Sequence, residues 1–120
     1  MTRPSLNALF ASLVTALTLS FTTTAQAQVG LAQLQAGDRP VTLLYPTSSM
    51  TQPTAFGRIT LDVAMGAEPP PGRHRLVLMS HGSGGSPAPD HALAATLVRA
   101  GFVVAQLLHE GDNYQDQRNP

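Results

Sequence analysis

The sequence predicts an α/β fold in which two leading strands precede a βαβ unit of a mostly parallel sheet. Residues 76–79 form a continuous apolar run and residues 102–108 a second, mostly apolar segment, which is typical of buried strands. Between these runs, Leu93, Leu97 and Ala100 recur at helical spacing. Apolar and polar residues alternate upstream of the runs, which favours half-exposed strands there. A strand, a helix and a second strand in this order predict a right-handed crossover between parallel strands.

Residues 1–27 have the three parts of a secretory signal peptide. Arg3 makes the beginning positive, an apolar run follows over residues 6–21, and the segment ends in the small-residue sequence Ala-Gln-Ala. A permanent membrane anchor is the weaker alternative, because hydroxyl residues interrupt the apolar run. We therefore expect residues 28–120 to form an exported product, periplasmic or extracellular, with no stable membrane anchor after cleavage.

The composition excludes several kinds of chemistry. The chain of 120 residues has seven basic and seven acidic residues and is only 12% charged, so we expect no nucleic-acid partner. All the basic residues are arginines, which excludes the lysine of a P-loop, a Schiff base or a Ser-Lys dyad. The absence of cysteine excludes thiol nucleophiles and cysteine zinc sites. Any chemistry must use oxygen nucleophiles, histidines or carboxylates, and we expect no cofactor.

The two leading strands are expected over residues 39–45 and 59–63. In the first, Val41, Leu43 and Tyr45 alternate with Thr42 and Leu44, and the run stops at a proline. In the second, apolar residues at 59, 61 and 63 alternate with the polar residues at 60 and 62. Residues 47–56 are rich in hydroxyl residues and are expected to form a loop, and residues 68–72 a turn. Residues 29–37 have no clear pattern, so we expect a lead-in that either pairs or frays at the domain edge. Two amphipathic strands joined by a loop favour an antiparallel start to the sheet.

The helix of the βαβ unit has recognisable ends. Asp90 occupies the expected N-cap position, Arg99 complements the last turn, and Gly101 stands where only glycine enters the left-handed region without cost. One helix cannot cover both faces of a sheet of about four strands, so one face should stay bare. The strand over residues 102–108 should also present an unpaired apolar edge, which would be a site of aggregation.

The loop over residues 80–89 follows the first apolar strand, where open α/β sheets bind ligands. As a dinucleotide fingerprint it fails, because Pro87 stands where the third glycine belongs. As a nucleophile elbow it also fails, since Ser83 and Ser86 each lack one of the two glycines of G-x-S-x-G. We therefore expect no nucleophile and no catalytic triad in this chain.

An oxyanion-hole loop is the interpretation that fits the glycines. Gly82 and Gly84 flank Ser83, so the backbone N–H of Ser83, or of a neighbour, can reach a developing negative oxygen without obstruction by side chains. His81 would orient this loop. The alternative is a glycine-rich connection without a chemical role.

A second polar loop follows the strand over residues 102–108. His109 and Asp112 are expected to hold this loop and, together with Asn113, to line the mouth of a substrate site. A purely structural turn is the alternative. A metal site is disfavoured, because no H-x-H or H-E-x-x-H spacing brings two imidazoles to one ion, and we expect no bound metal.

These motifs, taken together, resemble a known family. Tyr45-Pro46, S-H-G-S-G-G at residues 80–85, A-G-F-V-V at residues 100–104 and H-x-G-D-N at residues 109–113 occur in the order found in bacterial dienelactone-hydrolase-like α/β-hydrolases. That family is similar in pattern to platelet-activating-factor acetylhydrolases and related lipases. The resemblance covers residues 38–119 and corresponds to the amino-terminal third of such proteins.

The resemblance implies the amino-terminal part of an α/β-hydrolase fold, incomplete in this chain, and a Ser-His-Asp esterase. The chain departs from the family pattern because it contains neither the G-x-S-x-G elbow nor the triad histidine that follows it. A smaller departure is Glu110, where such proteins often carry proline.

Three functions are compatible with these observations. The leading one is part of an exported carboxylic-ester hydrolase for a small-molecule or lipid ester, which supplies the oxyanion-hole loop but is inactive by itself. The second is a catalytically inactive, truncated remnant. The third is a periplasmic anion-binding module, which is less favoured because Pro87 and Pro89 separate the glycines from the helix start.

Overall fold

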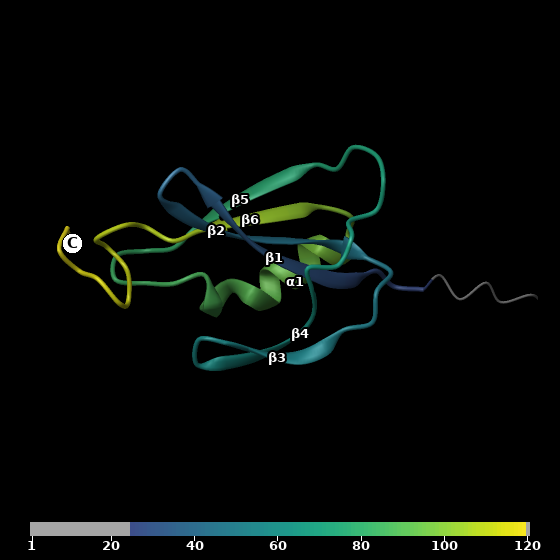
Figure 1. Cartoon of the computed structure of the whole chain (residues 1–120), viewed down its shortest axis with the longest axis horizontal. Helices are drawn as coiled ribbons and strands as arrows, with labels where there is room; N and C mark the ends of the chain where they lie inside the picture. Colours follow the sequence, from purple (N-terminus) through teal and green to yellow (C-terminus); the bar gives the residue numbers. More distant parts are fainter. Residues whose placement is uncertain (1–24, 120) are drawn as a thin grey trace, which may run out of the picture.

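The computed structural model describes residues 25–119, so nearly all of the predicted signal peptide, residues 1–27, lies outside the described residues. This part of the chain forms six strands and one α-helix, with one turn of 3-10 helix before it (Figure 1). The elements are β1 (Gln28–Ala36), β2 (Arg39–Thr47), β3 (Gln52–Phe56), β4 (Ile59–Met65), β5 (Leu76–Ser80), η1 (Ala88–Asp90), α1 (His91–Arg99) and β6 (Val103–Leu107). No helix within residues 25–119 is long and apolar enough to cross a membrane.

The six strands form one mixed sheet in the order β3-β4-β1-β2-β6-β5. Two hairpins supply the antiparallel pairs β1–β2 and β3–β4, and β2 also runs antiparallel to β6. The parallel neighbours are β1 with β4 and β5 with β6. The predicted α/β class is therefore present, but the sheet is mixed rather than mostly parallel.

Residues 29–37, expected to pair or fray at the domain edge, belong largely to β1, which pairs in the interior of the sheet rather than at its edge. The strand pairs with β2 along its whole length and with β4 on its other side. Val29 and Leu31 are buried in it, whereas its second half is exposed and carries two glutamines. The sequence lacks a clear signal here, because a strand of mixed polarity depends on its neighbours in the sheet more than on a local pattern.

The loop predicted over residues 47–56 is partly wrong, because its second half forms β3. β3 lies at one edge of the sheet and contains Pro53, a residue that edge strands tolerate. The strands predicted over residues 39–45 and 59–63 are confirmed as β2 and β4. They are not direct neighbours, since β1 lies between them.

The βαβ unit is present as predicted. β5 and β6 are parallel neighbours, and α1 lies in the chain between them. α1 follows Asp90, the predicted N-cap, although the Asp90 side chain makes no capping hydrogen bond. After the helix, Gly101 has a φ of 94°, in the region where an L side chain would be strained.

The prediction that residues 102–108 present an unpaired edge is wrong. β6 is paired on both sides, with β2 and with β5, because the crossover returns the chain to the inner side of β5. On this side of the sheet, the free edge is therefore that of β5. Leu76 and Leu78 are 58% and 65% exposed, so the expectation that residues 76–79 form a buried strand is wrong. The predicted bare face is present only at β5, because Val41, Tyr45 and Ala105 of the central strands are buried on the face that points away from α1.

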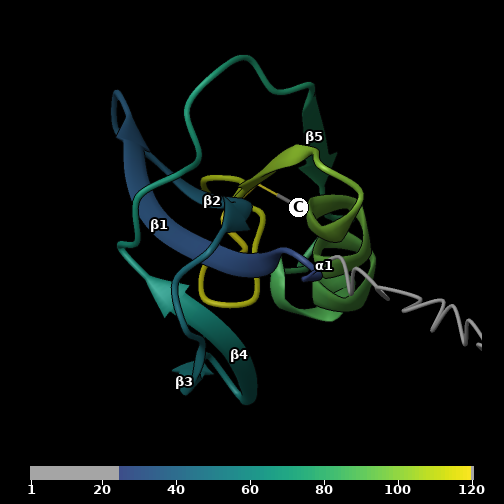
Figure 2. The same ribbon diagram turned by 90° about the vertical axis from the view of Figure 1, so that its right-hand side faces the viewer.

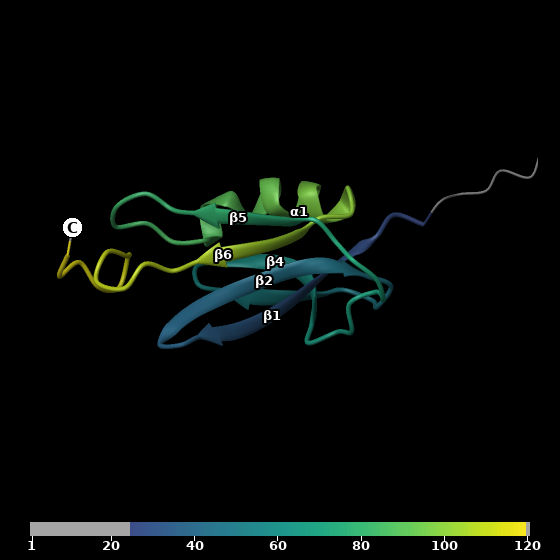
Figure 3. The same cartoon turned by 90° about the horizontal axis from the view of Figure 1, so that it is seen from above.

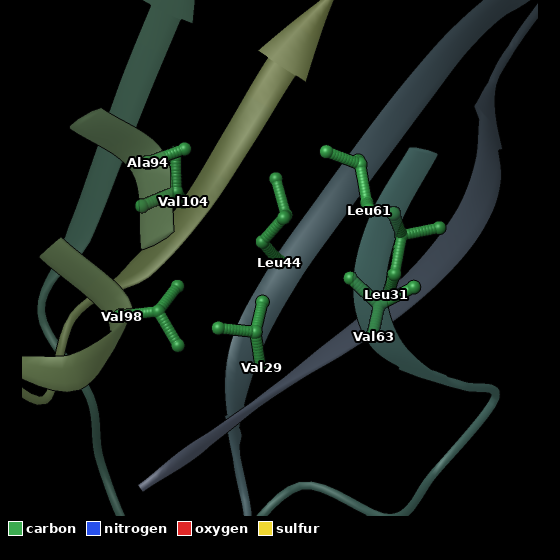
Figure 4. Packing of buried hydrophobic residues seen from close by; sticks show 8 residues of the cluster. All are labelled: Val29, Leu31, Leu44, Leu61, Val63, Ala94, Val98 and Val104. Carbon is green, nitrogen blue, oxygen red and sulfur yellow. The ribbon is translucent and has the colours of Figure 1, made fainter. Parts of the chain in front are cut away.

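The sheet curves around α1, and the core fills its concave side (Figure 2). The core joins apolar side chains of four strands to the buried side of the helix. Its buried members are Val29, Leu31, Leu44, Leu61, Val63, Ala94, Val98 and Val104 (Figure 4). This packing fixes α1 against the sheet and, with it, the end of the loop that leads from β5 into the helix.

β1 and β2 approach closely where Gly30 faces Tyr45. The two residues are partners across the strands, and a Cβ atom on Gly30 would lie 2.4 Å from Cε2 of Tyr45. The Tyr45 hydroxyl donates to the carbonyl oxygen of Ala67 at 2.5 Å, and burial raises the pKa of Tyr45. Glycine is thus required at position 30 to make room for the ring.

Candidate functional site

Two loops meet at the end of the sheet where the parallel strands β5 and β6 finish. The glycine loop, residues 81–87, leads from β5 to η1, and the post-β6 loop, residues 108–119, follows β6. Both loops lie at the same end of the sheet in two perpendicular views (Figure 1, Figure 3). Open α/β sheets bind ligands at this edge, so both predicted site segments lie where a ligand site is expected.

Asp112 joins the two loops by hydrogen bonds. Its Oδ1 atom accepts the backbone N–H of Gly84 at 2.7 Å and the hydroxyl of Ser83 at 2.8 Å. The Gly84 N–H first, and then the Ser83 hydroxyl, hold the pKa of the Asp112 carboxyl below its ordinary value. Because charge-assisted hydrogen bonds are stronger than neutral ones, the ionised carboxylate is the form that fastens the glycine loop.

His81 makes a second connection between the loops. Its Nδ1 atom lies 2.7 Å from the carbonyl oxygen of Gly82, and its Nε2 atom accepts the backbone N–H of His109 at 3.1 Å. Because Nε2 accepts a hydrogen bond, the proton of the neutral ring belongs on Nδ1, which then donates to Gly82. The rings of His81 and His109 meet edge to face, with their centroids 4.4 Å apart.

The glycines of the glycine loop form a tight turn. The backbone N–H of Gly85 donates to the carbonyl oxygen of Gly82 at 3.0 Å. Gly84 has a φ of 66°, in the left-handed region, and a Cβ atom on Gly85 would lie 2.8 Å from the Gly82 oxygen. The turn therefore requires glycine at both positions.

The backbone N–H groups of residues 83–85 differ in their partners. Gly84 donates to Asp112, and Gly85 donates to Gly82. No hydrogen bond formed among residues 25–119 uses the backbone N–H of Ser83, which is an exposed residue. Of these three groups, the Ser83 N–H is the one that is free to bind an external acceptor.

Asn113 organises the post-β6 loop from within. Its Nδ2 atom donates to the carbonyl oxygen of His109 at 2.6 Å, and its Oδ1 atom accepts the backbone N–H groups of Gln115 and Asp116 at 2.9 and 3.0 Å. Asn113 is buried, with 6% of its surface exposed. Asn113 thus holds a turn of this loop.

A contact between a serine and a histidine lies at the base of the two loops. The Ser80 hydroxyl oxygen is 2.7 Å from Nε2 of His109. No local pattern in the sequence predicts this pair, because the two residues are 29 positions apart. The places of the two residues in the predicted βαβ unit could have indicated the pair. Ser80 ends β5, His109 follows the end of β6, and these two strands are adjacent and parallel.

Two cavities lie on opposite faces of the sheet at this end. The first, of about 740 Å³, is lined in part by His109 and Asp112. The second, of about 490 Å³, has mostly apolar walls and includes Tyr114, whose backbone N–H donates to the glycine loop. Val41 borders the first cavity and Thr42 the second, and adjacent residues of a strand point to opposite faces.

The acidic residues of the post-β6 loop do not gather into a ligand set. Within residues 25–119, no three histidine, aspartate or glutamate side chains are arranged as a metal ion requires. Asp116 forms an ion pair with Arg118 at 2.7 Å, with Arg118 largely exposed. The side chain of Asp116 is thereby directed to a cation of its own loop.

Comparisons with known proteins agree with an esterase-like fold. Neither a protein-family model nor a curated protein sequence matches this chain. Among solved structures, the chain is similar to a ferulic acid esterase from Streptomyces cinnamoneus, at 25% sequence identity and a TM-score of 0.61. The match covers 75% of this chain and 36% of the esterase chain, so this chain spans well under half the length of that esterase. The described residues therefore form a fold that corresponds to part of an α/β-hydrolase-type esterase.

Proposed function

We propose that this chain is the amino-terminal portion of an exported carboxylic-ester hydrolase and that its glycine loop supplies a donor of the oxyanion hole. The observation that carries the proposal is the free backbone N–H of Ser83 in a glycine turn at the carboxyl end of β5. The similarity to part of an esterase supports it. The dienelactone-hydrolase-like and platelet-activating-factor-acetylhydrolase-like pattern of the motifs gives the finer family that we propose.

The chemistry that such a site serves is acyl transfer. A serine attacks the carbonyl carbon of the ester, and the carbonyl oxygen becomes negative in the tetrahedral intermediate. The Ser83 N–H would donate to that oxygen and stabilise it more than it stabilises the ground-state carbonyl. Collapse of the intermediate releases the alcohol, and water then hydrolyses the acyl-enzyme. The nucleophile, the histidine base and the acid would come from residues other than those of this chain.

The substrate that we propose is a small-molecule or lipid ester. The cavity of about 490 Å³ has mostly apolar walls and borders the end of the glycine loop, so it suits the apolar part of an ester. Because the similar structure is a ferulic acid esterase, esters of phenolic acids belong in the first set of substrates to be tested, beside lactones and short lipid esters.

Sequencing of the gene beyond the codon of Pro120 tests the proposal. An in-frame G-x-S-x-G motif, followed by an aspartate and a histidine, is the expected result. Labelling of the natural protein by a fluorophosphonate probe should then occur at the serine of that motif. A stop codon directly after Pro120 would contradict the proposal and favour the inactive remnant.

Export is tested separately from catalysis. Amino-terminal sequencing of the protein from the periplasm or the medium should give a chain that begins at Gln28. Retention of Met1 in a cytoplasmic protein would contradict the proposed export without affecting the proposed chemistry.

A further inference from the structure

We propose that Asp112 and His81 are positioning residues for the oxyanion hole, which hold the Ser83 N–H in place from the two sides of the glycine loop. We call these two residues and their hydrogen bonds the inter-loop bridge. The bridge forms only when the Asp112 carboxyl is ionised and the His81 ring is neutral with its proton on Nδ1. This inference rests on the proposed function, but its structural part can be tested independently of catalysis.

Asp112 fixes the peptide group between Ser83 and Gly84. The carboxylate oxygen Oδ1 binds the side chain of the first residue and the N–H of the second, at 2.8 and 2.7 Å. The Gly84 N–H is thereby directed to Asp112, and the turn bond of Gly85 fixes the next peptide group. The N–H groups of Gly84 and Gly85 both have hydrogen-bond partners within the protein. The turn, rather than solvent, therefore determines the orientation of the Ser83 N–H.

His81 fixes the other end of the same turn. Its Nδ1 proton is donated to the carbonyl oxygen of Gly82, which also accepts the N–H of Gly85. Its Nε2 atom accepts the backbone N–H of His109 and so ties this end to the post-β6 loop. A proton on Nε2 would bring two N–H groups face to face, so either the other tautomer or the protonated ring breaks this connection.

The charged surroundings of His81 come from the post-β6 loop. The titratable groups that act on it there are the ring of His109, in edge-to-face contact, and the carboxylate of Asp112. Within the glycine loop its hydrogen-bond partner is a carbonyl oxygen, which carries no titratable charge. The bridge therefore requires an ionised carboxylate at Asp112 and a His81 ring whose Nε2 atom is free to accept a hydrogen bond.

Magnetic resonance of the isotope-labelled chain of 120 residues tests the structural part. The nitrogen shifts of His81 should identify the Nδ1–H tautomer at neutral pH. The Gly84 amide should be protected from hydrogen exchange, whereas the Ser83 amide should exchange freely. The Nε2–H tautomer, or an unprotected Gly84 amide in a folded chain, would overturn the proposal.

The variant Asp112→Asn tests the carboxylate, and Asp116→Asn is its matched control in the same loop. Exchange of the Gly84 amide should become at least about tenfold faster in Asp112→Asn, because a neutral amide oxygen replaces the charged acceptor and accepts a weaker hydrogen bond. It should stay unchanged in Asp116→Asn, since Asp116 binds Arg118 and residues of its own loop. Equal exchange in the two variants would contradict the proposal.

Where Asp112→Asn fails to fold, Ser83→Ala decides the question. This variant keeps the Ser83 backbone N–H and loses only the hydroxyl bond to Asp112. Faster exchange at Gly84 with an unchanged Val104 amide is expected, and unchanged exchange at Gly84 would refute the bridge.

The kinetic part uses the natural full-length hydrolase. Asp112→Asn should lower kcat about 100-fold with little change in KM, because oxyanion contacts act in the transition state. A rise in KM alone would contradict a positioning role. Absence of any hydrolase activity in the unmodified protein would instead refute the proposed function. Hydrogen exchange of the Gly84 amide would then still show whether the inter-loop bridge forms.

Discussion

The hydroxyl oxygen of Ser80 lies 2.7 Å from Nε2 of His109, within hydrogen-bond distance of a potential general base. The pair has the spacing of a serine nucleophile and its base in acyl-transfer enzymes. It lies at the base of the loop that carries the proposed oxyanion donor. We expect this contact to be structural, and the ester-hydrolysis activity of the chain tests that expectation.

We predict that the chain of 120 residues does not hydrolyse p-nitrophenyl esters above a boiled control. Among the hydrogen bonds of the described residues, none joins Nδ1 of His109 to a carboxylate, so the ring lacks the acidic partner that orients the base of a triad. Ser80 also ends its strand without the sharp glycine-flanked turn of a nucleophile elbow. Release of p-nitrophenolate at neutral pH is the measurement.

Robust turnover would require a nucleophile among the serines of this end of the sheet. Turnover that is abolished by Ser80→Ala would identify the pair with His109 as catalytic. Turnover that survives Ser80→Ala and is lost in Ser86→Ala would instead identify Ser86.

The variant Gly30→Ala should destabilise the fold by about 1–3 kcal/mol, the usual cost of overpacking a well-packed site. The added methyl would lie 2.4 Å from Cε2 of Tyr45, so the ring or the strand must shift. Urea denaturation followed by circular dichroism measures the change. Gly82→Ala is the matched control, because its methyl would meet nothing within 4 Å. Equal stabilities of the two variants would contradict the packing argument.

The variant Leu78→Lys should raise the solubility of the chain at little cost to its stability. Leu78 is 65% exposed on β5, which forms a free edge of the described sheet, and a charge on an edge strand opposes association between chains. Light scattering at increasing protein concentration measures the effect. The same substitution at Leu44, which is 2% exposed, should prevent folding. Unfolding by Leu78→Lys would show that this side chain is covered.

The ionisation of Asp112 should make stability depend on pH in the acid range. Its pKa is lowered in the folded state from the ordinary 3.8, chiefly by the Gly84 N–H and next by the Ser83 hydroxyl. The stabilisation is therefore fully present above pH 3.8 and is lost as the pH falls through the lowered pKa. Denaturation curves should give different free energies of unfolding for the unmodified chain and Asp112→Asn near pH 5. The two free energies should become equal as the pH falls below the lowered pKa of Asp112. A difference that is independent of pH would contradict this assignment.

The parts of the fold that the sequence predicts are those with local signals. The βαβ unit follows from two apolar runs and from Gly101, whose φ of 94° only a glycine adopts easily. β1 and β3 escape prediction because their polar residues obscure the alternation and their conformation depends on pairing. The order of the strands escapes as well, since no local pattern says that β6 lies between β2 and β5.

The same division applies to the site. The glycine loop and the post-β6 loop are recognisable in the sequence, because glycines and polar residues follow apolar strands. The bonds between them, from Asp112 to Ser83 and from His109 to Ser80, join residues 29 positions apart. Such bonds depend on the adjacency of two parallel strands, which the crossover establishes only in three dimensions.

The central position of β6 has a consequence for how the chain folds during its synthesis. The hairpins β1–β2 and β3–β4 connect neighbouring segments and can form as soon as they emerge. In the described sheet, β5 has β6 as its one partner, so it must wait without hydrogen-bonded neighbours until residue 107 has emerged. During that interval its leucines are open to chaperones or to other chains. Of the described strands, the last one made is thus the one that unites the amino-terminal hairpins with β5.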